Sequence, residues 1–85
     1  MGRREWAEGY LEELNPEALF LGGYDEAIIG ITDSQVVYSE RAIIDTLVSE
    51  GCSEEDAWDH YGFNILGSIQ DQMDYPLIIR TVEED

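Results

Sequence analysis

Residues 27–50 read AIIGITDSQVVYSERAIIDTLVSE and begin with two short runs of β-branched and aromatic residues. The first run is Ala27–Thr32 and the second is Val36–Ser39, and the turn-forming residues 33–35 separate them. Short β-branched runs on either side of a turn are typical of a β-hairpin. Gly30 interrupts the first run, which indicates a bulge or a close approach to a helix.

The second half of the same stretch has the pattern of a helix. Ser39 can accept a hydrogen bond from the first turn as an N-cap, and Gly51 provides a C-terminal stop, so we expect a helix from Glu40 to Glu50. The apolar residues of this helix form one wide stripe: Ala42, Ile43, Ile44, Leu47 and Val48. We expect Ile43, Ile44 and Leu47 to be buried against the strands.

Helical patterns also lie on both sides of this stretch. Residues 3–14 have the spacing of an amphipathic helix, and its apolar residues Trp6 and Leu14 are expected to be protected from solvent. Asn15-Pro16-Glu17 resembles a helix start, which predicts a second short helix over residues 18–21 before Gly22-Gly23. Ser53 begins a near capping box, so another helix is expected from Glu54.

The C-terminal part completes the predicted fold. Residues 63–67 are expected to be irregular and 68–75 to form a polar loop, and a final strand, Leu77–Val82, follows Pro76. The order ααββααβ predicts an α+β fold, with a three-stranded, mainly antiparallel sheet packed against helices. We expect one domain over residues 1–85, with an N-terminal helical segment (1–21) and a ββααβ core (24–82).

Composition restricts the classes of function. The chain has 85 residues, 20 acidic against 4 basic, no lysine and a net charge of -16. Direct binding to nucleic acid or to an anionic membrane requires Lys and Arg, so a basic protein is the expected partner. Cys52 is the single cysteine, which excludes an internal disulfide and suggests a reducing cytoplasm. No apolar run is long enough to span a membrane, and no cofactor is expected.

A resemblance to a known group of proteins adds to these expectations. Residues 24–31, 40–47, 54–64 and 76–78 together resemble a family of small acidic proteins carried by bacteriophages and prophages. The resemblance covers about residues 24–82; it implies a phage setting and the ββααβ core, and it transfers no site residue. Small acidic phage proteins include anti-CRISPR and anti-restriction proteins that imitate DNA, and this chain is similar to those in size and charge.

Two rows of carboxylates are candidates for binding a partner. Carboxylates at i, i+3 and i+4 on a helix stand about 5–6 Å apart at Cβ, comparable with the phosphates of a nucleic-acid strand. The candidate residues are Glu5, Glu8 and Glu12 on the first helix and Glu54, Glu55, Asp56 and Asp59 on the last. A solvated helix face would have the same pattern. The total charge favours binding, because solubility alone needs a net charge of magnitude about 2–8.

Catalytic and metal-binding patterns are weaker. Cys52 and His60 are the only conventional nucleophile and base, and Asp56 lies one turn from His60, but the surrounding acids disfavour a thiolate. Asp56 and His60 with Asp59 or Glu55 would place few metal ligands on one exposed helix face. We therefore expect no enzyme activity and no metal.

Two functions remain open. The first is a phage-encoded, non-enzymatic inhibitor of the anti-CRISPR type, which binds the basic nucleic-acid-binding surface of a bacterial defence complex by DNA mimicry. The alternative is an acidic adaptor for protein–protein interaction that docks through its first helix, where Trp6 and Tyr10 lie. In either case the protein is expected to be a monomer or a homodimer. Trp58, Tyr61 and Phe63 are expected to pack in the core.

Overall fold

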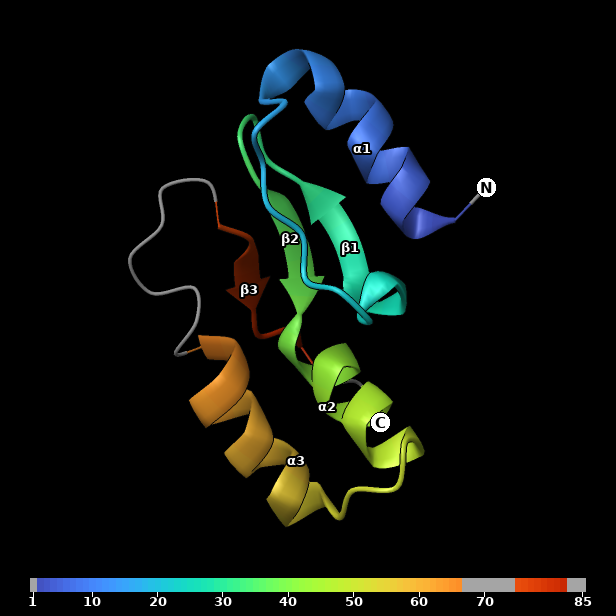
Figure 1. Cartoon of the computed structure of the whole chain (residues 1–85), viewed down its shortest axis with the longest axis vertical. Helices are drawn as coiled ribbons and strands as arrows, with labels where there is room; N and C mark the ends of the chain where they lie inside the picture. The colour runs from blue at the N-terminus through green and yellow to red at the C-terminus, as the bar shows by residue number, and fades with distance from the viewer. Residues whose placement is uncertain (1, 67–74, 83–85) are drawn as a thin grey trace.

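The computed structural model describes residues 2–66 and 75–82 of the chain. Its elements, in order, are α1 (Arg3–Leu14), the 3₁₀ helix η1 (Asp25–Ala27), β1 (Ile28–Ile31), β2 (Val36–Ser39), α2 (Glu40–Ser49), α3 (Glu54–His60), the π-helix η2 (Tyr61–Leu66) and β3 (Leu77–Ile79) (Figure 1). The α+β class expected from the sequence is confirmed. Most of the expected polar loop, residues 68–74, lies outside the described residues.

The sheet is mixed rather than mainly antiparallel. Its strand order is β1-β2-β3; β1 pairs antiparallel with β2, and β2 pairs parallel with β3, with Val37 opposite Leu77. Parallel strands need a long crossover, and α2 and α3 lie in the connection between β2 and β3. The register shifts between Ile28 and Gly30, so the expected irregularity in the first strand is confirmed.

The helix boundaries follow from local hydrogen bonds. The Ser39 hydroxyl accepts from the backbone N–H of Ala42 at 3.2 Å, and the Ser53 hydroxyl accepts from that of Asp56 at 3.2 Å. After α2, Gly51 has a φ of 108°, a left-handed conformation that side chains oppose. Both expected N-caps and the glycine stop are therefore confirmed.

The expected second helix, over residues 18–21, does not form. One turn closes where Ala18 N–H donates to Asn15 C=O at 3.1 Å, and the chain beyond it crosses the sheet without regular structure (Figure 1). The backbone N–H of Leu21 donates to the Tyr38 hydroxyl at 2.9 Å. A four-residue apolar segment is too short to offset helix nucleation, so this contact with the sheet determines its conformation instead.

One hydrophobic core joins the helices and the sheet. As expected, Ile43, Ile44 and Leu47 of α2 are buried. The other core residues come from α1, the hairpin, α3 and η2: Ala7, Leu11, Ala27, Ile28, Val36, Tyr38, Ala57, Tyr61 and Ile65. The first helix therefore packs on the same core as the ββααβ segment.

Three aromatic or apolar residues are more exposed than expected. Trp6 of α1 is 41% exposed, Leu14 is 50% exposed and Phe63 of η2 is 82% exposed. In α1 the small Ala7 and the next turn's Leu11 make the buried line of the helix, so Trp6 and Leu14 lie on its flank. Phe63 falls in a π-helical turn that continues α3, whereas an irregular segment was expected there.

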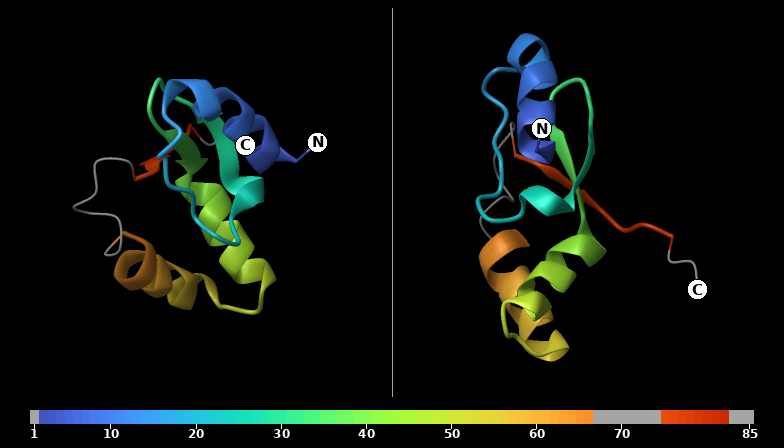
Figure 2. Two further views of the ribbon diagram at one scale, coloured as in Figure 1. Left: turned by 45° about the horizontal axis from the view of Figure 1, so that its top comes forward. Right: turned by 90° about the vertical axis from the view of Figure 1, so that its right-hand side faces the viewer.

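The two ends of the molecule are occupied by different helices. The described chain measures 39 × 30 × 22 Å along its principal axes. Helix α1 lies beside β1 at one end of the long axis, and α3 lies at the other end, as both Figure 1 and Figure 2 show. The two acidic helices are therefore separated by the sheet and α2.

Candidate functional site

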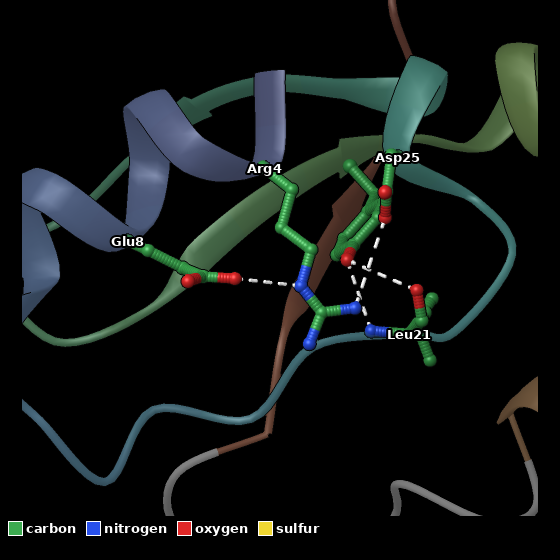
Figure 3. A network of polar contacts seen from close by, with 5 residues as sticks. Arg4, Glu8, Leu21 and Asp25 are labelled. Atoms are coloured by element: carbon green, nitrogen blue, oxygen red, sulfur yellow. Dashed lines mark hydrogen bonds and ion pairs between the residues drawn. The ribbon is translucent and has the colours of Figure 1, made fainter. Parts of the chain in front are cut away.

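All four arginines form ion pairs with the protein's own carboxylates. Arg4 has the most contacts: its Nε donates to Glu8 Oε1 at 2.7 Å, its Nη1 lies 3.9 Å from Asp25 Oδ1, and its guanidinium lies over the Phe20 ring at 5.0 Å (Figure 3). The hydrogen bond to Glu8 raises the pKa of Arg4 above its usual value. Arg4 thus links α1 to the segment that follows it.

The other three arginines are held in the same way. Arg3 pairs with Glu26 at 4.0 Å, Arg41 pairs with Asp45 and Glu54 at 2.9 Å each, and Arg80 pairs with Glu40 at 3.1 Å. The hydrogen bond from Arg41 to Glu54 raises the pKa of Arg41. Every positively charged side chain of the protein, His60 aside, is therefore neutralised locally.

The remaining acidic side chains face solvent without a cationic partner. Among the described residues, these exposed carboxylates make no ion pair: Glu5, Glu12, Glu13, Glu17, Asp33, Glu50, Glu55, Asp56 and Asp59. They include five of the seven acidic residues that the sequence suggested. The other two, Glu8 and Glu54, are also exposed but are bonded to Arg4 and Arg41.

The three candidate acids of α1 line one groove. Glu5, Glu8 and Glu12 lie along an open hollow of about 630 Å³ between α1 and residues 15–20. Its floor and far wall are partly apolar, with Leu11, Pro16, Ala18 and Phe20. We call this feature the acidic groove. A carboxylate edge beside apolar surface suits the long side chains of Arg and Lys, whose aliphatic stems cover apolar groups while the charged ends pair with carboxylates.

The four candidate acids of α3 do not contribute to that groove. Glu54 is next to the buried side of its helix, where it accepts a hydrogen bond from Arg41 at 2.9 Å, and Glu55, Asp56 and Asp59 are exposed. Because α1 and α3 lie at opposite ends of the molecule (Figure 1), the two rows form separate surfaces. The structure thus brings together the residues within each row but not the two rows.

Buried polar contacts fix the far wall of the acidic groove. Tyr38 is fully buried, and its hydroxyl accepts from the Leu21 N–H at 2.9 Å and lies 3.5 Å from the Leu21 carbonyl oxygen. Burial raises the pKa of Tyr38 above its usual value. Sequence reasoning missed Arg4, Phe20 and Tyr38 as positioning residues. The i, i+4 spacing of Arg4 and Glu8 was a readable signal for the first of these.

The candidate catalytic residues are not brought together. Cys52 precedes α3 and contacts the core, whereas His60 lies exposed in the last turn of that helix, about 10 Å further along its axis. The nearest polar partner of His60 is Asn64, with 3.3 Å between Nδ1 and Nδ2. Within residues 2–66 and 75–82, no group of three potential metal ligands gathers.

No protein-family model, curated protein or solved structure matches this chain. None of the helices in the described part of the chain is long and apolar enough to cross a bilayer. The function is therefore inferred from the geometry and charge of the residues themselves.

Proposed function

We propose that this protein is a non-enzymatic inhibitor that occupies a basic nucleic-acid-binding surface of another protein by imitating nucleic acid. The resemblance to small acidic phage proteins makes a bacterial defence complex, such as a CRISPR effector, the first partner to test. The single cysteine suits action in the reducing cytoplasm of the host cell.

The separation of charges supports this proposal most strongly. All four arginines pair with neighbouring acids, while nine carboxylates of the described residues stay exposed and unpaired. The field outside the protein is therefore almost wholly negative. A field of this kind steers a basic groove toward the protein and raises the association rate.

The acidic groove gives that field a local geometry. Glu5 and Glu12 lie two turns apart on α1, about 10 Å along the helix axis, and both are free of arginine. Glu8 stands between them and is held by Arg4 at 2.7 Å. A partner's Lys and Arg side chains would pair with the outer two carboxylates, as they pair with phosphates.

Reversing the charge of free carboxylates tests the proposal. The variant Glu5→Lys with Glu12→Lys leaves the Arg4–Glu8 pair intact, and Glu55→Lys with Asp59→Lys tests the α3 row. The control, Asp33→Lys with Glu50→Lys, makes the same change in net charge at exposed positions outside both rows. The measurement is inhibition of DNA binding by CRISPR effector complexes, at two salt concentrations, with melting temperatures recorded for each variant.

The expected result is a loss of inhibition confined to one row. Each reversal turns an attraction of up to ~1 kcal/mol into a repulsion, so a double reversal should weaken binding about tenfold or more. Inhibition by the unaltered protein should also weaken as salt is added, because screening acts over about 8 Å in physiological salt. Full inhibition by both double variants at unchanged melting temperature, or no inhibition by the unaltered protein, would contradict the proposal.

A further inference from the structure

Helix α1 exposes three large apolar side chains on one flank. Trp6 is 41%, Tyr10 55% and Leu14 50% exposed, and the Trp6 and Tyr10 rings meet edge to face with their centroids 5.2 Å apart. A spacing of four residues keeps side chains on one side of a helix, so the three form a continuous row. We call this row the apolar stripe. It lies on the opposite flank of α1 from Glu5, Glu8 and Glu12.

The apolar surface continues from the helix onto the edge of the sheet. Trp6 and the backbone bulge at Ile28 and Ile29 line an open hollow of about 440 Å³, together with Gly2 and Arg3. Ile29 is itself 46% exposed. Isolated exposed apolar residues are common on protein surfaces, but a contiguous group of four large ones marks an interaction site.

The charged groups around the apolar stripe are acidic. On the helical wheel Glu13 is the neighbour of Trp6 on the outer side, and it is exposed without an ion pair to a described residue. Glu26, 90% exposed, lies at the N-terminal end of the stripe. The one cation there, Arg3, donates to the Ile28 carbonyl at 2.8 Å and pairs with Glu26. A partner therefore meets an apolar row with a negative rim.

This combination selects the occupant. A second copy of the chain would bring two bodies of net charge -16 together with Glu13 and Glu26 repeated on both sides, which like-charge repulsion opposes. We propose that the apolar stripe binds an amphipathic helix of a partner protein whose apolar face is bordered by Lys or Arg. Such a helix covers the stripe and pairs with its rim at the same time.

The dimensions fit recognition by a short helix. The stripe extends over eight residues of α1, or about 12 Å of helix axis, which matches two to three turns of a partner. Helix-in-groove recognition uses apolar anchors at i, i+3, i+4 and i+7, and these can pack beside Trp6, Tyr10 and Leu14. The inference is independent of the proposed inhibition, which uses the opposite flank of α1.

A synthetic helix serves as the probe. The experiment measures fluorescence anisotropy of a labelled peptide of about 18 residues, made of leucine and lysine with the leucines at helical spacing on one face. A second peptide of the same composition distributes the leucines around the helix. The variant Tyr10→Ser with Leu14→Ser removes two anchors, and Phe63→Ser removes an exposed aromatic residue at a distance from α1 as a matched control.

The proposal expects discrimination between the two peptides. The protein should bind the one-faced peptide about tenfold or more tightly than the scattered one, Tyr10→Ser with Leu14→Ser should abolish the difference, and Phe63→Ser should preserve it. Equal binding of both peptides would mean that charge alone attracts them, and would overturn the proposal. Self-association of the protein in sedimentation, lost in the Tyr10→Ser, Leu14→Ser variant, would assign the stripe to a second copy and also overturn it. Neither outcome depends on whether nucleic-acid binding is inhibited.

Discussion

Replacing Tyr38 with phenylalanine should loosen the far wall of the acidic groove. The ring fits the core unchanged, so the substitution removes only the hydroxyl group, which accepts from the Leu21 N–H at 2.9 Å. Leu21 belongs to the segment that crosses the sheet between α1 and η1, and we found no regular structure there to supply another acceptor. The N–H of Leu21 would therefore lose its partner in the folded state.

The magnitude follows from the burial of the two groups. Leaving a buried donor unsatisfied costs about 1–3 kcal/mol, and the half-buried position of Leu21 places the loss at about 1–2 kcal/mol. For a domain of this size, each 1 kcal/mol lowers the melting temperature by about 4–8 °C. With a urea dependence of about 1 kcal/mol per M, the unfolding midpoint should fall by about 1–2 M.

Urea unfolding and amide hydrogen exchange together test this prediction. The matched control is Tyr10→Phe, since Tyr10 is 55% exposed and its hydroxyl has no hydrogen-bond partner among the described residues. Tyr38→Phe should lower the unfolding midpoint and speed exchange of the Leu21 amide, and Tyr10→Phe should change neither. A midpoint for Tyr38→Phe equal to that of Tyr10→Phe, with Leu21 still protected, would refute the reasoning.

Three further predictions concern the core, a helix cap and alkaline pH. Leu11→Ala, at a position only 2% exposed, should cost about 2–5 kcal/mol in urea unfolding, and Trp6→Ala should cost less than half as much because Trp6 lies largely outside the core. Ser39→Ala should lower stability by about 1 kcal/mol in thermal melting through loss of the α2 cap, with Ser34→Ala as a neutral control. Burial and the hydrogen bond to Glu40 raise the pKa of Tyr61, so its contribution to stability is complete below about pH 10, the ordinary tyrosine pKa, and falls at higher pH as the unfolded chain releases the proton first. Unfolding measured from pH 8 to 11 should therefore decline less steeply in Tyr61→Phe, and an identical slope would contradict the prediction.

Local patterns determined the elements that the sequence predicted well. Ser39 and Ser53 cap their helices through bonds only three residues long, and such bonds can be read from sequence. The segment over residues 18–21 failed because its conformation depends on Tyr38, a residue 17 positions from Leu21. The parallel direction of β3 follows from the two helices that precede it, but the alignment of Val37 with Leu77 is set by packing.

The candidate surface was predictable in part for the same reason. Helical spacing and charge were enough to place the acidic rows on exposed faces. The pairing of individual acids was only partly readable, because Arg4 with Glu8 is an i, i+4 pair, whereas Arg41 and Glu54 are 13 residues apart and Arg80 and Glu40 are 40 apart. Which carboxylates remain free for a partner is thus a property of the folded chain.

The parallel pairing of β2 with β3 also affects how the chain is made. Ribosomes add about 5–20 residues per second, so β2 emerges several seconds before the residues of β3 that complete the sheet. During that interval the open edge of β2 offers unpaired backbone groups to neighbouring nascent chains. The net charge of -16 keeps such chains apart, and a version ending before Leu77 should therefore stay dispersed in low salt and aggregate when salt screens the repulsion.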